Sequence, residues 1–308
     1  MLSSTGAAWL VFAVMIVALL ALDLVALARR DRPLTIREAT RWSALVVASA
    51  FLFGGYVYWA MGPTRAFEYY AGYLVELSLS VDNLFVFILI FQYFGVPAEA
   101  KPKVLNWGII GAALMRGIFV AVGSVALRRF DWLFIVLGVL LLVTAIRMFR
   151  NVDEHIEPER NPLVRLVKRV MPITAAYDRS AFFVRSHAGW MATPLLIVVL
   201  VVEWTDLVFA IDSIPAIFAI TNDPLIVYSS NIFAIVGLRA MFFVLASGLD
   251  RFVYLKPGVG LILAFVGVKM ILTKWVHLPI QLSLTLIVSV LAGSILLSLL
   301  RQRRVPEG

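Results

Sequence analysis

Nine long runs of apolar residues alternate with short polar segments along the chain. Each run has about 18 residues or more, the length that an α-helix needs to cross the apolar core of a lipid bilayer. The runs cover residues 7–28, 42–61, 70–93, 104–127, 130–149, 191–220, 226–246, 257–275 and 280–300. The pattern therefore predicts an all-α, polytopic membrane protein with about nine transmembrane helices.

The composition supports a single membrane domain over residues 1–308. Hydrophobic residues make up 62% of the chain and charged residues only 15%, which is far too apolar for a soluble domain of this length. The longest polar segment, 151–190, includes the stretch LVRLVKRV at 163–170, a pattern typical of a short amphipathic helix on a membrane surface. No basic segment precedes the first run, so we expect a retained helix rather than a cleaved signal peptide.

The basic residues are distributed unevenly between the segments that join the runs. Twenty of the 27 Lys and Arg residues fall on the side of the segment 29–41, and four fall on the other side. Because cytoplasmic loops carry the excess of Lys and Arg in membrane proteins, we expect an inner (plasma) membrane protein with its N-terminus outside. The segment 151–190 and the C-terminus are then cytoplasmic. The net charge of +8 reflects orientation, and we expect no nucleic-acid partner.

An internal repeat is clearest in two polar motifs within the apolar runs. ELSLSVDNLF begins at Glu76 and DLVFAIDSIP begins at Asp206, and the two align without gaps. This alignment pairs Glu76 with Asp206 and Asp82 with Asp212. Downstream, MRGIFV (115–120) parallels LRAMFFV (238–244), so Arg116 matches Arg239, and Arg147-Met148 parallels Lys269-Met270.

We therefore expect two repeats of three helices each, at 66–150 and 191–276, separated by the cytoplasmic segment 151–190. Three is an odd number and no membrane span lies between the repeats, so they should have opposite orientations in the membrane. Inverted repeats are common in secondary transporters, where the substrate binds near the bilayer midplane at the repeat interface.

Five carboxylates lie deep within the apolar runs, and each is costly there. An Asp at the centre of a transmembrane helix costs about 2.5–3.5 kcal/mol on insertion scales. The five are Glu76, Asp82, Glu203, Asp206 and Asp212. One explanation is internal ion pairing or gating by the three basic residues within the runs, Arg116, Arg239 and Lys269. Three cations leave two of the five acids over.

A bound divalent cation is the second explanation. Ser80, Asn83, Thr205 and Ser213 add oxygen ligands, with Asn83 and Ser213 beside the second acid of each motif. Such a set suits Mg²⁺, Ca²⁺ or Mn²⁺. The chain has no cysteine, which excludes thiolate ligands. We predict Asp82 and Asp212 as primary ligands with carboxyls within about 10 Å of each other. The full predicted set is Glu76, Asp82, Asn83, Asp206, Asp212, Ser213 and Glu203. Crowded carboxylates also raise one another's pKa values, so protons can bind there as well.

The spacing within each motif raises a geometric question. Asp82 and Asp212 follow the first acid of their motif by six residues, or about 240° of helical turn. A straight helix cannot direct both acids to one point, so either several helices surround it or the helix breaks. Pro215, which removes one helical hydrogen bond, favours a break in the second motif helix.

With these residues in view, the chain resembles the TerC family of integral membrane proteins. ELSLSVDNLFVF (76–87) and TDLVFAIDSIPAIFAIT (205–221) carry the resemblance, which covers about residues 40–300. That family is associated with manganese export, with tellurite-resistance loci and, in plastids, with thylakoid membrane-protein assembly. The resemblance implies Mn²⁺ efflux. The motif residues it carries over are Glu76, Asp82, Asn83, Asp206, Asp212 and Ser213.

The expected function is a secondary transporter that exports a divalent cation, Mn²⁺ first, by exchange with protons. Its expected partners are the lipid bilayer and the metal ion, which is the substrate. We expect no permanently bound cofactor and no enzyme activity, and the sequence does not determine the oligomeric state. The chain has no G-x-x-x-x-G-K-[ST] motif, which argues against ATP as the driver. A membrane scaffold that assists insertion or assembly without transport is the alternative. An intramembrane aspartyl protease is disfavoured, because neither Asp82 nor Asp212 has a Gly-x-Gly-Asp context.

Overall fold

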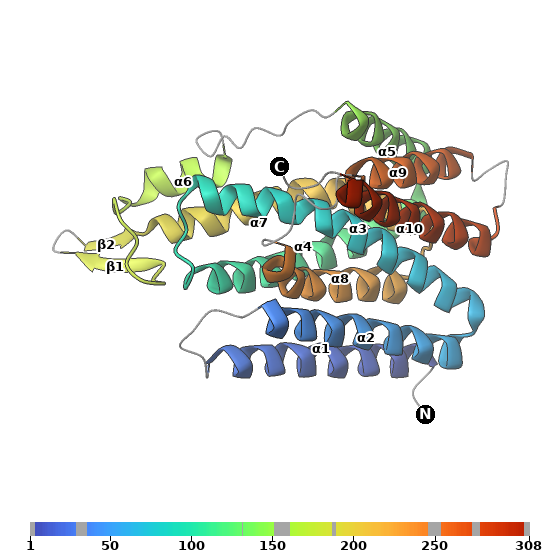
Figure 1. Cartoon of the computed structure of the whole chain (residues 1–308), viewed down its shortest axis with the longest axis horizontal. Coiled ribbons are helices and arrows are strands. Elements are labelled where there is room, and N and C mark those ends of the chain that lie inside the picture. The colour runs from blue at the N-terminus through green and yellow to red at the C-terminus, as the bar shows by residue number, and fades with distance from the viewer. Residues whose placement is uncertain are drawn as a thin grey trace.

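The computed structural model describes residues 4–28, 36–130, 132–150, 161–186, 189–245, 254–272 and 278–304. These residues form ten helices and one two-stranded sheet (Figure 1). The helices are α1 (Ser4–Ala28), α2 (Ile36–Met61), α3 (Pro63–Tyr93), α4 (Lys101–Arg129), α5 (Leu133–Phe149), α6 (Pro162–Val170), α7 (Pro194–Phe218), α8 (Pro224–Leu245), α9 (Leu255–Leu272) and α10 (Ile280–Arg304). The strands are β1 (Phe183–Ser186) and β2 (Gly189–Ala192).

The helical membrane architecture expected from the apolar runs is confirmed in outline. Each of the nine runs overlaps a helix, and α6 lies in the polar segment between the fifth and sixth runs. Among the described residues, α1, α2, α4, α7 and α10 are long and apolar enough to cross a membrane by length and composition, and α5, α8 and α9 are shorter apolar helices. The count of nine spans and the inverted repeats remain predictions.

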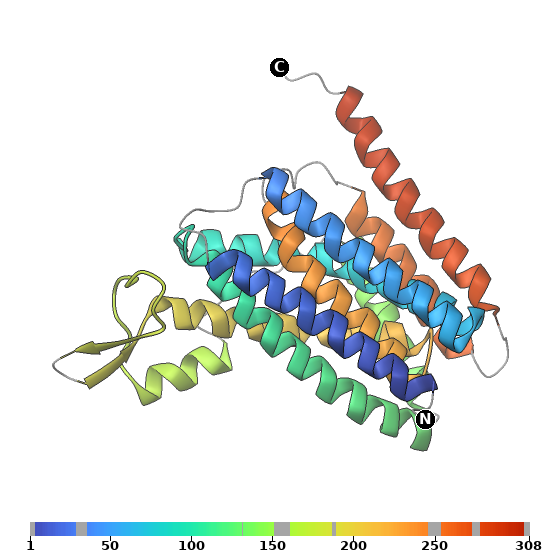
Figure 2. The ribbon, with the colours of Figure 1, turned by 90° about the horizontal axis from the view of Figure 1, so that it is seen from below.

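The long helices form a bundle, with α6 and the β1–β2 hairpin at one end (Figure 1). Helix α3 packs against α2, α7, α8 and α10, and α4 packs against α7 and α8. Helix α10 lies at the edge of the bundle, on the side away from α6 (Figure 2). The helices that carry the two motifs and their aligned arginines, α3, α4, α7 and α8, therefore pack together, and α4 exposes one apolar face on the outside of the bundle.

Part of the expected cytoplasmic segment is folded rather than extended. The stretch 163–170 forms the helix expected from its pattern, and Asn161 caps it by accepting hydrogen bonds from the backbone N–H groups of Leu163 and Val164 at 2.9 and 3.3 Å. The hairpin that follows pairs β1 and β2 in antiparallel register. Between α6 and β1, Tyr177 donates its hydroxyl hydrogen to the Phe94 carbonyl at 2.7 Å. The segment is thereby fastened to the turn between α3 and α4.

Glycines allow α5 and α9 to pack closely. A Cβ added at Gly138 would lie 2.9 Å from the Gly267 carbonyl oxygen, and one added at Gly267 would lie 2.9 Å from the Gly138 carbonyl oxygen. Gly138 also lies against Ile271, and Gly260 lies against Phe149. Later residues of α5 thus meet earlier residues of α9, so the two helices run antiparallel.

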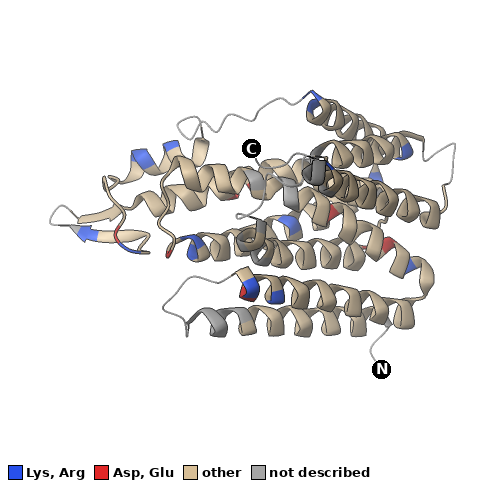
Figure 3. Ribbon diagram, in the orientation of Figure 1, with Lys and Arg blue, Asp and Glu red and all other residues tan. Residues whose placement is uncertain are grey.

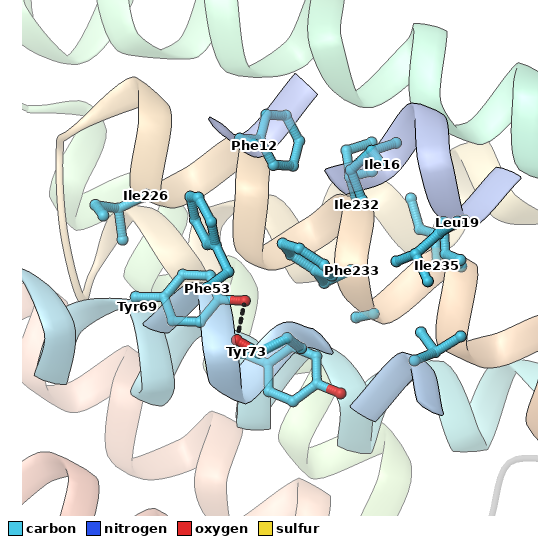
Figure 4. Close-up of a cluster of buried hydrophobic side chains, with 14 of the residues drawn as sticks. Phe12, Ile16, Leu19, Phe53, Tyr69, Tyr73, Ile226, Ile232, Phe233 and Ile235 are labelled. Atoms are coloured by element: carbon cyan, nitrogen blue, oxygen red, sulfur yellow. Dashed lines mark hydrogen bonds between the residues drawn. The ribbon is translucent and has the colours of Figure 1, made fainter. Parts of the chain in front are cut away.

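An aromatic cluster joins α1, α2, α3 and α8 (Figure 4). Phe53 lies at its centre, with ring centroids 5.3 Å from Tyr69, 5.4 Å from Phe233 and 5.8 Å from Phe12. Tyr69 donates to the Ala50 carbonyl at 3.0 Å. Ring packing of this kind adds about 0.5–1.5 kcal/mol per pair beyond area burial, so the cluster helps to hold α1 against α2 and α8, and α2 against α3.

Candidate functional site

Four helices each place one buried polar side chain at a common point. Glu76 comes from α3, Arg116 from α4, Asp206 from α7 and Asn231 from α8. The exposed fraction is 0% for Glu76, Arg116 and Asn231 and 5% for Asp206. The point therefore lies at the contact between the two predicted repeats.

Arg116 holds this group together. Its Nη1 donates hydrogen bonds to Glu76 Oε1 and to Asn231 Oδ1. Its Nη2 lies 3.7 Å from Asp206 Oδ1, close enough for an ion pair. The first acid of one motif and the first acid of the other thus share a single guanidinium.

A buried ion pair of this kind is sensitive to loss of one partner. Removing one member leaves an uncompensated charge and typically costs about 3–5 kcal/mol. Two carboxylates against one guanidinium also leave one negative charge over within this described group. Internal pairing by Arg116 therefore accounts for part of the charge in this group and leaves a remainder.

Several polar atoms around the group have no hydrogen-bond partner. Within the described part of the chain, eight buried side-chain nitrogen or oxygen atoms are in this state. They are Tyr73 Oη, Glu76 Oε2, Ser80 Oγ, Asn83 Nδ2, Arg116 Nε, Arg116 Nη2, Asp206 Oδ2 and Ser213 Oγ. Buried polar groups in native proteins are almost always satisfied, by protein, water or ions. Their concentration at and beside the two motifs indicates a binding site for an ion or another polar ligand.

The contacts between α3 and α7 follow an antiparallel register. One residue forward along α3 corresponds to one residue backward along α7. The paired positions are Glu68 with Thr221, Gly72 with Ile217, and Glu76 with Ser213. Ser213 faces the Glu76 carboxylate, although Ser213 Oγ has no well-formed hydrogen bond within the described residues.

Continuing this register places the second acids of the two motifs at levels five residues apart. The Asp82 position lies opposite Leu207, and the Asp212 position lies opposite Leu77. The two backbone levels are then about 7.5 Å apart along the helix axes, at 1.5 Å per residue. The side chains of Asp82, Asp212 and the aligned Arg239 lie outside the described residues, so their contacts stay predictions. The residues next to the acids, Asn83 and Ser213, are 4% and 1% exposed.

Glu203 lies one turn before Asp206 on α7 and is only partly buried. Its carboxylate rests directly on Gly111 of α4, where a Cβ would collide with it. Within the described residues, no group of three or more His, Asp or Glu side chains is arranged to hold a metal ion. The predicted cation site therefore depends on Asp82 and Asp212.

Lys269 lies in a different polar cluster from Arg116. Its Nζ donates to Ser283 Oγ at 3.1 Å, and it interacts electrostatically with Glu68. Glu68 in turn accepts hydrogen bonds from Arg65 at 2.8 Å and from Thr221 at 2.6 Å. This cluster links the start of α3 to the end of α7, two turns from Glu76 along α3.

The expected break at Pro215 does not occur. Helix α7 runs without interruption through Pro215 and ends at Phe218. A proline removes one helical hydrogen bond and crowds the residue four before it, and three residues from the end of a helix few further bonds depend on it. The alternative explanation of the six-residue spacing was that several helices surround each motif helix. This is what the structure has: α7 packs against α3, α4 and α5, and α3 packs against α2, α7, α8 and α10.

Two residues of the site were not among the sequence candidates. Asn231 completes the contacts of Arg116, and Tyr73 adds an unpartnered hydroxyl beside the first motif. Three consecutive polar residues, 229–231, inside an apolar run would have signalled Asn231. Tyr73 gives no such signal, because an aromatic residue in an apolar run is ordinary core.

Comparison with known proteins gives a family match and several full-length relatives. The model of the integral membrane protein TerC family matches residues 61–305. An uncharacterized membrane protein of Myxococcus xanthus, STKORF319, is 44% identical over 298 residues, covering 97% of this chain and 93% of the relative. A protein of Escherichia coli K12 named "Putative membrane-bound redox modulator Alx" is 39% identical over 299 residues, covering 94% and 93%. An uncharacterized membrane protein of Rickettsia bellii is 37% identical over 297 residues, covering 96% and 98%. No solved structure matches the chain.

Proposed function

The chain belongs to the integral membrane protein TerC family, and from this premise we propose that it is a secondary transporter that exports a divalent cation. Mn²⁺ is the proposed substrate, and protons are the proposed exchange ion. The transported ion binds between the two motifs, with Asp82 and Asp212 as primary ligands. Glu76, Asp206, Asn83, Ser213 and Glu203 complete the shell or carry protons.

The observation that carries the proposal is the group of unpartnered polar atoms where the motif helices meet. Glu76 Oε2, Asp206 Oδ2, Ser80 Oγ and Ser213 Oγ are four buried oxygens without partners among the described residues. Carboxylate and hydroxyl oxygens are the ligands that hard divalent cations prefer. A bound cation would satisfy these oxygens and offset the negative charge that Arg116 leaves over.

The packing of the helices supports the inverted-repeat arrangement that the proposal assumes. Exchanging α3 with α7, α4 with α8 and α5 with α9 turns the α3–α8 contact into the α7–α4 contact. The same exchange turns the α5–α7 contact into the α9–α3 contact, and α5–α9, α3–α7 and α4–α8 map onto themselves. The antiparallel register of α3 with α7 fits repeats of opposite orientation, with the site on their pseudo-twofold axis.

The charge distribution supports the proposed orientation. Basic residues gather on α6, on β1 and at the starts of α2 and α4, which lie at one end of the bundle (Figure 3). With this end in the cytoplasm, a reporter active only in the periplasm should be silent when fused at position 170 and active at position 223. The reverse pattern would contradict both the orientation and the inverted repeats.

Cellular metal content tests the function directly. Expression in a manganese-sensitive bacterial host should lower cellular manganese, measured by mass spectrometry, and should protect the cells from excess Mn²⁺. Asp212→Asn at the same membrane level should restore both values to those of cells without the protein. Unchanged manganese in cells with and without the protein would contradict the proposal, and the other divalent metals in the same samples would identify a different substrate.

A membrane scaffold is the second candidate, and the folded segment after α6 favours it. Phe183 and Trp190 of the hairpin are 46% and 63% exposed, and Val170 at the end of α6 is 71% exposed. Such side chains suit contact with lipid or another membrane protein. If Asp212→Asn supports full function while substitution of Trp190 abolishes it, the scaffold is the better explanation. Redox activity by thiol exchange would need another protein, because this chain has no cysteine.

A further inference from the structure

The contacts of Arg116 are uneven, and this unevenness indicates a second role for it. A guanidinium has five N–H donors arranged as a fork that can bind a carboxylate through two bonds. Arg116 uses only Nη1 for its two hydrogen bonds, and Nε and Nη2 have no hydrogen-bond partner among the described residues. An arginine with a purely structural role at 0% exposure would be expected to use more of its donors.

The two acids are held to different degrees. Glu76 accepts a hydrogen bond from Arg116, whereas Asp206 is an ion-pair neighbour at 3.7 Å without one. Oxygen atoms of both carboxylates remain unpartnered within the described residues. The guanidinium therefore lies between two acids that both retain the capacity to bind another cation.

A divalent cation between these acids would lie beside the guanidinium. Like charges a few ångströms apart in a low-dielectric interior repel strongly, so the cation and Arg116 cannot both keep close contact with Glu76 and Asp206. Asn231 offers Arg116 a neutral alternative. It already accepts a hydrogen bond from Nη1, and its own Nδ2 is anchored on the Val227 carbonyl at 2.8 Å.

We propose that Arg116 is a built-in substitute for the transported cation. When no metal is bound, Arg116 compensates one of the two charges of Glu76 and Asp206 and the exchanged proton neutralises the other. It withdraws toward Asn231 when a divalent cation binds. This inference rests on the proposed function, since it assigns Arg116 a part in cation exchange at the same site. Its consequence is that the protein can return to the loading side without exposing uncompensated acids to the membrane interior.

The test compares the full-length wild-type protein with Arg116→Gln in lipid nanodiscs and in proteoliposomes. Calorimetry with MnCl₂ alone should show tighter binding for Arg116→Gln, by about tenfold, because its competitor for the acids is gone. In proteoliposomes loaded with Mn²⁺, net efflux should be lost. Exchange of internal Mn²⁺ for external radioactive Mn²⁺ should persist, because exchange does not require the unloaded protein to return.

A merely structural arginine predicts a different result. Arg116→Gln would then lower the melting temperature without tightening Mn²⁺ binding and would reduce net efflux and exchange together. Either weaker or unchanged binding, or parallel loss of both fluxes in folded protein, overturns the proposal. A wild-type protein that neither binds nor moves Mn²⁺ refutes the proposed function instead, before any variant is compared.

Asn231→Leu is the second test variant, used if Arg116→Gln does not fold. It keeps Arg116, Glu76 and Asp206 and removes the neutral hydrogen-bond acceptor of Arg116. Arg116 should then remain with the two acids, so Mn²⁺ binding should weaken several-fold and both fluxes should slow. Unchanged or tighter binding by folded Asn231→Leu would overturn the proposal. Size-exclusion chromatography of each variant checks that the comparison is made on folded protein.

Discussion

Helices α3 and α7 carry the same acid-to-acid spacing, but the two helices meet different neighbours. Glu76 on α3 accepts a hydrogen bond from Arg116, whereas Asp206 on α7 lies 3.7 Å from it without one. Three residues before the first acid, α3 has Tyr73, which is 0% exposed among aromatic rings. At the matching position, α7 has Glu203, partly buried against α4.

The two motif helices therefore match at the first acid and differ one turn before it. Both helices supply acids at the centre, but only α7 has a further carboxylate one turn away. In the predicted orientation, Tyr73 lies on the outer side of the first acids and Glu203 on the cytoplasmic side. A carboxylate attracts a cation much more strongly than a neutral phenol does, so we infer that the cation approaches the site from the cytoplasm past Glu203.

The largest effect should come from the second acids, where the two helices are expected to be equivalent. Asp82→Asn and Asp212→Asn should each lower export by on the order of 100-fold or more, since loss even of outer-shell partners costs 10–100-fold in metal sites. The measurement is cellular manganese, with immunoblotting of membranes as the control. Membrane levels should be maintained, because Asn is less costly in a membrane span than Asp. Full export by either variant would contradict a site shared between the helices.

The first acids should differ in their contribution to stability. Glu76→Gln removes the charged acceptor of an Arg116 hydrogen bond while Asp206 still compensates the guanidinium, so it should destabilise the protein by about 1.5–3 kcal/mol. Asp206→Asn removes a longer contact without a hydrogen bond and should cost about 1 kcal/mol or less. Thermal unfolding of the purified protein in detergent should therefore show the lower melting temperature for Glu76→Gln. Equal melting temperatures would show that Arg116 serves both acids alike.

The sequence predicted the helices and the identity of the charged residues, but only part of the site. The 18-residue apolar runs dictate helices, because a bilayer leaves few other ways to satisfy the backbone. The sequence also offered Arg116 as a pairing candidate. It did not predict that one guanidinium joins the acids of both repeats, because this depends on how four helices cross.

The errors and omissions have local causes. Pro215 suggested a helix break. Because Pro215 lies near the end of α7, the helix tolerates the lost hydrogen bond and continues to Phe218. Asn231 was not predicted because a neutral polar residue in an apolar run does not indicate which residue it contacts. The role of Gly111 depends wholly on what lies across the helix interface, which no local pattern contains.

A moderate effect is expected on the flanks of the motifs. Glu203→Gln should reduce Mn²⁺ export by about tenfold, at the low end of losses from outer-shell groups, with little change in membrane level. Tyr73→Phe should leave export within about twofold and should not lower the melting temperature, because it removes a buried hydroxyl without a described partner, which itself costs about 1–3 kcal/mol. Initial rates of Mn²⁺ efflux measure both. An equal loss of export in the two variants would remove the asymmetry between the flanks.

Gly111, which lies against Glu203 from α4, should have a smaller effect than Glu203 itself. A Cβ at this position collides with the Glu203 carboxylate, and this flexible group can move aside, so Gly111→Ala should fold. Replacing glycine by alanine stabilises the helix by up to about 1 kcal/mol, but the new methyl group displaces the Glu203 carboxylate from its position against α4. Export should fall by about two- to fivefold. Gly117→Ala is the matched control on the same helix, because a Cβ there would lie 3.5 Å from Tyr228, an ordinary contact, and its export should be unchanged. If Gly111 acts through Glu203, the double variant with Glu203→Gln should be no worse than Glu203→Gln alone. Additive losses would mean that Gly111→Ala acts elsewhere, on the packing of α4 against α7.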